Sequence, residues 1–287
     1  METIVRSLRP GLRGRVIERA DLLFKPLLRR PPKGGLSVLA GRRVVGVRRR
    51  GKMALIELDG GDGTGASGRT RGRNDLVGPG LTLVFHLKMT GQLLLAGRGA
   101  EPPDKHTRLV VKFRDGRSEL RFRDVRKFGF LLCVSGNPEG ACRELACLGP
   151  EPLDISFDDF AAALRGRKGR IKSLLLDQTV VAGVGNIYAD EMLFDARIHP
   201  LTTTGALSQK DVVHLFASMK KILELAIAAK GSSISDYVDA DGQAGEFQFL
   251  HKVYDREGEP CAACGRPIKR IVVGGRGTHF CPGCQRE

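Results

Sequence analysis

Four of the seven cysteines lie near the C-terminal end of the chain, as two Cys-x-x-Cys pairs that 16 residues separate. Two such pairs on adjacent turns can surround one tetrahedral Zn²⁺, whose borderline-soft character suits thiolate ligands. Because four thiolates leave no open coordination position, we expect one structural zinc ion rather than a catalytic one. The alternative, two disulfides, is disfavoured in a reducing compartment. The predicted ligands are Cys261, Cys264, Cys281 and Cys284.

Basic residues lie between the two cysteine pairs, on what the sequence predicts to be a β-hairpin. They are Lys269, Arg270 and Arg276. A rigid hairpin that carries arginine is suited to entering a groove of a nucleic acid and to pairing with phosphates.

A glycine-rich turn, Gly183-Val184-Gly185, precedes Asn186 at a predicted helix start. Glycines allow close backbone approach, and free amides at a helix N-terminus can hold an anion. Four basic residues lie just upstream, and the alternative interpretation of these four is a solvated helix face. They are Arg167, Lys168, Arg170 and Lys172.

Two predicted turns combine basic and bulky apolar residues. In the segment RFRDVRKFGF, Arg126 precedes Phe128, and this pattern suits phosphate contact together with insertion of a side chain between bases. The alternative is a hairpin whose phenylalanines belong to the core, which we favour for Phe122 and Phe130. Met89, at the turn in HLKMTG, is either a core residue or a second inserted side chain.

Lys52 lies beside three arginines in the segment RRRGKMALIE. A lysine among cations can have a lowered pKa and transfer protons, and the alternative role is a phosphate contact. The histidines show no metal-binding spacing, and His86 is interpreted as strand packing.

The pattern of apolar residues changes near residues 148–154. Before this boundary, over about residues 36–134, alternation with turn signals at Gly51-Lys52 and Asp115-Gly116 is typical of short antiparallel strands. After it, the apolar spacing becomes helical.

Several helical signals follow the boundary. Ser156 with Asp159 is a predicted N-cap and capping-box pair, and Ile171 to Leu176 forms a further apolar turn. A short helix is predicted from Asn186 to Phe194. A long amphipathic helix opens at Ser208 and Asp211, which form a capping box, and runs to about Lys230.

Two further segments stand out. Residues 1–9 have a helical pattern that Pro10-Gly11 is expected to end. Residues 60–80 are rich in glycine and lack apolar periodicity, so they predict a surface loop.

The 287 residues carry a formal net charge of +15 with a pI near 9.9, and about +13 remains once four thiolates bind one Zn²⁺. An excess of this size favours a polyanionic partner such as nucleic acid or an anionic membrane surface, and the alternative is a basic surface with no such partner. No run of about 20 apolar residues predicts a membrane helix, and no secretory signal is recognised. We therefore expect a cytoplasmic protein without a membrane partner.

Taken together, these segments resemble the bacterial formamidopyrimidine-DNA glycosylases, the family shared with endonuclease VIII. The motifs occur in family order over nearly the whole chain: ETIVRSLRPGL, RRGKMALIEL, HLKMTG, DVRKFG, LGPEPL, GVGNIYADE, VYDREGEPC and the cysteine pairs. The resemblance implies an α+β fold with a β-sandwich domain (1–150), a helix-two-turns-helix DNA-binding domain (151–250) and a zinc finger (251–287).

The resemblance also implies roles for individual residues. Met89, Arg126 and Phe128 match the residues that fill the space left by an everted nucleotide, with Arg126 facing the orphaned cytosine. Asn186 and Arg276 match a phosphate-gripping pair. Lys52 matches a lysine assigned to β-elimination, and Arg276 also matches an arginine linked to δ-elimination. Further DNA contacts are implied for His106 and Lys168.

The chain departs from the family pattern at its beginning. Family chains begin MPELPEVE, and the proline exposed by removal of methionine is the nucleophile. Here Met1 occupies the valine position and Glu2 matches the final glutamate of that motif, not the catalytic one. We expect that the sequence is recorded from a downstream start, with five residues missing that would span about 17 Å when extended.

The leading hypothesis is a monomeric, nucleoid-associated DNA glycosylase and abasic-site lyase that removes oxidised purines from double-stranded DNA in base-excision repair. The alternative is a catalytically inactive protein that binds damaged DNA, if the chain begins as written. A zinc-ribbon protein that binds RNA is a third, lower-ranked interpretation.

Overall fold

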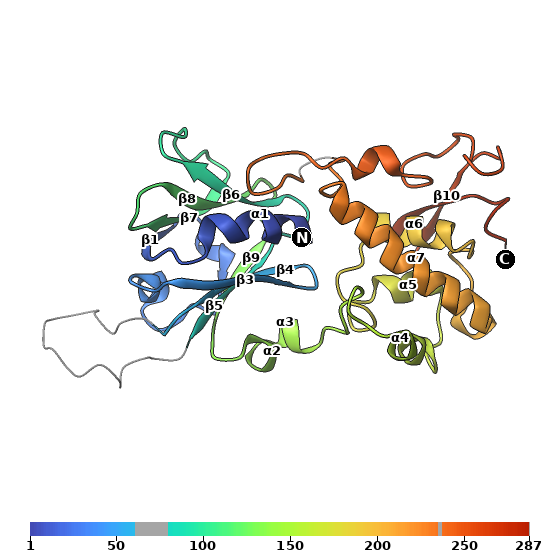
Figure 1. Ribbon diagram of the computed structural model, residues 1–287, viewed down its shortest axis with the longest axis horizontal. Helices are drawn as coiled ribbons and strands as arrows, with labels where there is room; N and C mark the ends of the chain where they lie inside the picture. The colour runs from blue at the N-terminus through green and yellow to red at the C-terminus, as the bar shows by residue number, and fades with distance from the viewer. Residues whose placement is uncertain (61–79, 235–236, 287) are drawn as a thin grey trace, which may run out of the picture. The chain divides into compact units, whose positions relative to one another are not determined.

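The computed structural model describes residues 1–60, 80–234 and 237–286 (Figure 1). The described chain divides into two compact units, one of residues 1–146 with 233–245 and the other of 147–232 with 246–287. Most of the predicted loop over 60–80 lies outside the described residues. The predicted domain boundaries after residues 150 and 250 remain predictions. The structure differs from them in grouping 233–245 with the first unit.

The first unit contains two sheets. The five-stranded sheet has the order β2-β9-β5-β4-β3, and its strands are antiparallel except for the short β2–β9 pair. Its strands are β2 (Leu28–Arg29), β3 (Val44–Arg50), β4 (Met53–Leu58), β5 (Leu81–His86) and β9 (Phe130–Ser135). The predicted turn at Gly51-Lys52 joins β3 to β4, with Arg50 opposite Met53.

The four-stranded sheet is antiparallel and has the order β1-β7-β8-β6. Its strands are β1 (Ile17–Leu22), β6 (Gly91–Gly97), β7 (Thr107–Phe113) and β8 (Ser118–Asp124). The predicted hairpin at Asp115-Gly116 joins β7 to β8, and Gly116 has the positive φ that this turn needs. Phe85 and Phe122, both fully buried, stack with ring centroids 5.9 Å apart and connect the two sheets in one core.

Helix α1 (Glu2–Leu12) buries Ile4, Val5, Leu8 and Leu12 in that core. The prediction that this helix ends at Pro10-Gly11 is wrong. Proline lacks only its own N–H, and near a helix C-terminus the loss of one bond is offset by burial of the next apolar residue. Leu12 is fully buried, and the Arg13 N–H donates to the Arg9 carbonyl at 3.1 Å, so the helix continues to the end of its apolar face.

Short helical segments complete the first unit. They are the 3₁₀ turns η1 (Lys25–Leu27) and η2 (Gly35–Leu39), and the helices α2 (Pro138–Ala141) and α3 (Arg143–Ala146).

The second unit is helical. Its helices are α4 (Phe157–Leu164), α5 (Ile171–Leu176), α6 (Asn186–Asp195) and α7 (Gln209–Ala228), with 3₁₀ turns η3 (Thr204–Ala206) and η4 (Phe247–Leu250). The predicted capping box of α7 is confirmed: the Asp211 N–H donates to Ser208 Oγ, and Asp211 accepts the Ser208 N–H. Among the described residues, no helix is long and apolar enough to span a membrane.

The second unit ends in a hairpin of β10 (Lys269–Val273) and β11 (Arg276–Phe280). Its turn is Gly274-Gly275, with φ of 56° and 74°. Two successive positive φ values fit a tight hairpin turn that residues with a Cβ rarely adopt, which explains the glycine pair.

Candidate nucleic-acid interface and metal centre

The four predicted cysteine ligands come together beside the hairpin. Their Sγ atoms all lie within 4.8 Å of one another, with Cys264 and Cys281 3.3 Å apart and Cys261 and Cys284 3.9 Å apart. A Zn–S bond of about 2.3 Å in a tetrahedron implies sulfur atoms about 3.8 Å apart, so this donor set fits one Zn²⁺.

Backbone contacts shape each cysteine pair. The Gly265 N–H donates to the Cys261 carbonyl, and Gly265 has a φ of 74° that closes the first turn. In the second pair, the buried amide of Gln285 accepts the Cys281 N–H at 2.9 Å and donates to the Ile198 carbonyl at 2.9 Å. Gln285 therefore fixes the metal centre to the chain that follows α6.

A buried ion pair fixes the hairpin to the helices. Lys172 in α5 and Asp190 in α6 are 2.6 Å apart, and both side chains are 0% exposed. The Lys172 ammonium also donates to the Gly277 carbonyl at 3.1 Å and to Thr278 Oγ1 at 2.6 Å. Burial lowers the pKa of Lys172 below its usual value, while the charge of Asp190 opposes that shift. On the other side, Asp190 accepts the His279 N–H at 2.9 Å.

Asn186, the first residue of α6, completes this arrangement. Its Nδ2 donates to the Gly277 carbonyl at 2.9 Å, so that one carbonyl accepts from both Asn186 and Lys172. Arg276 precedes Gly277 in the chain and is exposed. The structure therefore brings Asn186 and the backbone next to Arg276 onto one rigid support, as a pair that grips phosphate requires.

In the first unit, the predicted inserted residues lie together on two adjacent turns. Met89 and Phe128 are 65% and 51% exposed, which is unusual for such large apolar side chains. Arg126 joins them: its Nη1 lies 3.3 Å from Met89 Sδ, and its guanidinium carbon lies 4.8 Å from the Phe128 ring centre. Phe122 and Phe130 are buried, which confirms their interpretation as core residues.

Asp124 holds these two turns in place. This buried carboxylate accepts the Thr90 hydroxyl from the first turn and the Arg126 and Gly129 N–H groups from the second. Lys88 and Lys127 both have a positive φ. A residue other than glycine keeps this strained backbone conformation only where the surrounding contacts hold it in place.

Lys52 is half-buried at the turn between β3 and β4. The next residue, Met53, begins β4 and lies opposite His86 of β5. Burial and the charges of Lys88, Lys52 and Arg29 lower the pKa of His86 to about 4. Its Nδ1 accepts the Lys88 N–H at 3.0 Å, so this ring supports the turn that carries Met89.

His106 and Lys168 occupy less constrained positions. His106 is half-buried, and its N–H donates to Asp104. Lys168 is exposed in the link between α4 and α5. Each lies in the same unit as other predicted DNA-binding residues, but the described contacts do not join either one to them.

Three family models together cover most of the chain. The model described as the formamidopyrimidine-DNA glycosylase N-terminal domain matches residues 1–131, and the model for the H2TH domain of the same enzyme matches 148–238. A model for a zinc finger found in FPG and IleRS matches 258–286. A formamidopyrimidine-DNA glycosylase of Solibacter usitatus is 46% identical over 288 residues, covering 100% of this chain and 98% of that protein. The chain belongs to the formamidopyrimidine-DNA glycosylase family.

Other members of the glycosylase family agree. An enzyme of this name from Listeria monocytogenes is 38% identical over 289 residues, covering 100% of this chain and 98% of its own. Among solved structures, a Lactococcus lactis FPG mutant in complex with Fapy-dG-containing DNA has a TM-score of 0.85 at 34% identity, covering 100% and 98% of the two chains. MutM (FPG) of Thermus thermophilus has a TM-score of 0.83 at 38% identity, covering 100% and 97%.

Membership in the glycosylase family confirms the predicted resemblance, the α+β fold class and the zinc finger. Sequence reasoning missed Asp190, and it interpreted Lys172 only as part of a basic surface. One signal was present: α6 has charged residues, Asp190 and Glu191, inside an otherwise apolar segment with no polar face. A charge in such a segment predicts a buried partner.

Proposed function

We propose that this chain is a DNA glycosylase and abasic-site lyase that excises oxidised purines from double-stranded DNA. Its solved relatives from Lactococcus lactis are described in complex with Fapy-dG-containing DNA and with DNA containing an abasic site. The observation that carries the proposal is the shared support of Asn186 and the Arg276 hairpin on the Gly277 carbonyl. This support keeps Asn186 close to the backbone beside Arg276, which favours a shared role for the two residues in phosphate binding.

We further propose the division of labour among the site residues. Asn186 and Arg276 hold the backbone beside an everted nucleotide, and Lys168 and His106 add DNA contacts. Met89, Arg126 and Phe128 occupy the space that the nucleotide leaves, which offsets an unstacking cost of a few kcal/mol. Lys52 transfers protons during β-elimination, and Arg276 contributes to δ-elimination of the abasic strand.

The chemistry of the family needs an amine nucleophile, which the resemblance assigns to the proline in the MPELPEVE start of family chains. The test therefore uses two proteins: the chain as printed, and a chain in which Pro-Glu-Leu-Pro-Glu precedes residue 1 and valine replaces Met1. Each is mixed with a duplex containing oxoguanine opposite cytosine and treated with borohydride, which reduces an imine between the amine and sugar C1′ to a stable adduct.

We expect the extended chain to form the covalent adduct and to cleave the abasic strand. An extended chain that binds the duplex without forming an adduct contradicts the proposed activity. If only the printed chain lacks the adduct while it still binds, the printed form is the damaged-DNA-binding protein of the alternative hypothesis. Stronger binding to RNA than to an abasic duplex contradicts both.

Arg126 provides a sharper test of the lesion-site assignment. An Arg126→Ala variant of the extended chain is expected to lose its preference for cytosine over adenine opposite the lesion. An Arg143→Ala variant, at an exposed arginine outside the site, is the matched control. Equal opposite-base preference in both variants contradicts the role of Arg126.

We also propose that the protein acts in the cytoplasm on nucleoid DNA, as its substrate requires. A fluorescent fusion in bacterial cells is expected to overlap with stained DNA, and an even distribution through the cell contradicts this location.

A further inference from the structure

The exposed side of α1 carries three arginines: Arg6, Arg9 and Arg13. Their spacing of three and four residues places them on one face of the helix, opposite the buried apolar face. Together with Pro10 they line an open hollow of about 520 Å³. We call these three residues the arginine face.

Two of these guanidinium groups are held by their inner nitrogen. Arg9 Nε donates to the Val47 carbonyl at 3.1 Å, and Arg6 Nε donates to Glu2 at 2.8 Å. These bonds use Nε and not the terminal Nη groups, and they reduce the side-chain entropy that binding would otherwise cost. Within the described part of the chain, no carboxylate lies within ion-pair distance of Arg13.

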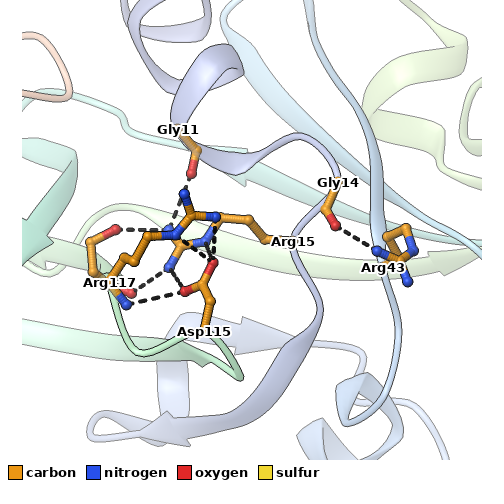
Figure 2. Close-up of polar contacts among 7 residues, drawn as sticks. Gly11, Gly14, Arg15, Arg43, Asp115 and Arg117 are labelled. Carbon is orange, nitrogen blue, oxygen red and sulfur yellow. Dashed lines mark hydrogen bonds and ion pairs between the residues drawn. The ribbon is translucent and has the colours of Figure 1, made fainter.

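Several hydrogen bonds hold the C-terminal end of α1 in place (Figure 2). Arg15 turns inward and pairs with both carboxylate oxygens of Asp115, at 2.9 Å and 2.6 Å. It also donates to Ser118, through both the hydroxyl and the carbonyl, and to the Gly11 carbonyl within the last turn of α1. In the same region the exposed Arg43 donates to the carbonyl of Gly14, the residue that follows Arg13 in the chain, at 2.8 Å.

The same contacts place Arg13, at the C-terminal end of the arginine face, far from the turns of this unit that carry Met89 and Arg126. Arg15 bonds to Ser118 at the start of β8, whereas Arg126 follows Asp124 at the end of that strand. Six residues of a strand span about 20 Å. The C-terminal end of α1 and the Met89, Arg126 and Phe128 cluster therefore lie at opposite ends of one sheet.

We propose that the arginine face binds the phosphate backbone of a second stretch of DNA, distinct from the stretch held at the lesion site. Arg6 to Arg13 rise about 10 Å along the helix, and one strand of B-DNA carries about three phosphates over the same axial length. Guanidinium forks match phosphate oxygens. Pro10 is the one apolar residue that lines the hollow, so the apolar anchors on which protein partners usually depend are lacking there.

The experiment first saturates the protein with a short duplex that contains an abasic-site analogue, and then titrates a second, fluorescent, undamaged duplex. We expect the wild-type complex to bind the second duplex. An Arg6→Gln/Arg9→Gln/Arg13→Gln variant should bind it at least tenfold more weakly. The slope of log K against log salt for this second event should become shallower by about 3. The affinity for the first duplex should not change.

Two further variants make the result interpretable. Arg13→Glu breaks none of the contacts described above, so it reports on binding even if loss of the Arg9 bond to Val47 destabilises α1. An Arg19→Gln/Arg143→Gln/Lys210→Gln variant removes the same charge from exposed positions off the arginine face and should bind like wild type.

Failure of the saturated wild-type complex to bind a second duplex would overturn the proposal, as would equal binding by the wild type and the triple variant. Stronger binding of an oligoglutamate peptide than of DNA at the arginine face would overturn the choice of DNA as its partner. This proposal is independent of excision: an inactive chain with intact second-duplex binding counts against the proposed function and not against the arginine face.

Discussion

At the scale of single residues, loss of the buried Lys172–Asp190 pair has the largest expected effect on the free energy of unfolding. An Asp190→Asn substitution leaves the ammonium of Lys172 buried without an opposite charge, which costs about 3–5 kcal/mol. We expect the free energy of unfolding of the second unit to fall by this amount, and DNA affinity to fall with it as the hairpin loosens. Denaturant unfolding, followed by a probe in the second unit, measures the change.

Asp195, also in α6, supplies the matched control. It pairs at 2.6 Å with Lys221, whose side chain is 59% exposed, so Asp195→Asn should cost at most about 1 kcal/mol. Equal changes in the free energy of unfolding for the two substitutions would show that burial does not make the Lys172–Asp190 pair more important for stability than an exposed pair.

His86 predicts a pH dependence of stability. Its pKa is about 4 in the folded protein against an ordinary value of 6.5, so between these values the unfolded chain binds a proton that the folded chain does not. Stability from the neutral ring is complete above about pH 6.5 and is lost as the pH falls toward 4. At pH 5 the loss is about 2 kcal/mol relative to pH 7.5.

Urea unfolding at pH 7.5 and pH 5 measures this effect. A His86→Gln variant should show a smaller difference between the two pH values than wild type. His214→Gln, at an exposed position in α7, should leave the difference unchanged. The assignment fails if the His86→Gln variant keeps the full wild-type pH dependence.

At the scale of elements, Gly149 shows why the segment LGPEPL needs a glycine. A Cβ at this position would lie 2.6 Å to 2.8 Å from backbone atoms of Thr179 and Val180, and the Gly149 N–H donates to the Gln178 carbonyl at 2.8 Å. Because backbone atoms cannot move aside cheaply, Gly149→Ala should destabilise the second unit by about 1–3 kcal/mol.

Gly205 provides the comparison, since a Cβ there meets no atom within 4 Å and its backbone is not in the left-handed region. Thermal unfolding of the two alanine variants should therefore differ, with Gly205→Ala near wild type. A Gly149→Ala protein with the wild-type melting temperature would contradict the close approach seen here.

Local patterns predicted most elements because each pattern reports a local cause. Ser208 and Asp211 predicted the start of α7 because a capping box acts within four residues. The end of α1 was predicted wrongly because burial of Leu12, a tertiary effect, outweighs the local effect of Pro10. The Lys172–Asp190 pair was missed for the same kind of reason: its members are 18 positions apart in the chain, and only the packing of α5, α6 and the hairpin brings them together.

The residues of the candidate site also fall into those that the sequence predicted and those that it did not. The sequence motifs supplied the four cysteines, which the structure brings together, and the exposed positions of Met89, Arg126 and Phe128. They did not reveal the supports of these residues. Asp124 and Gln285 act through single buried hydrogen-bonding groups, and no spacing in the sequence marks such groups.

At the scale of the whole molecule, the two units depend differently on the metal. The hairpin has a small core of its own, in which two ligands, Cys261 and Cys281, pack with Val253 and Ile268. Binding of zinc therefore supplies much of the folding free energy of this segment. The sandwich core contains none of the four ligands.

Removal of zinc with a chelator should accordingly unfold the hairpin and leave the sandwich folded. Hydrogen exchange should show lost protection over residues 258–286 and retained protection in β4 and β5, with DNA affinity reduced. Addition of Zn²⁺ should restore both. A single cooperative loss of protection across both units would contradict this independence.

The position of segment 233–245 in the chain affects how the sandwich folds while the ribosome synthesises the protein. Ala240, fully buried in the sandwich core, accepts the Leu95 N–H with its carbonyl and donates its own N–H to Ser7 Oγ, and Tyr237 bonds to Thr3. These partners are synthesised more than 140 positions earlier. At about 5–20 residues per second, a nascent sandwich finished through residue 146 waits about 5–20 seconds for its last piece. During that interval the growing chain lacks the residues that cover this part of the sandwich core, beside α1 and β6.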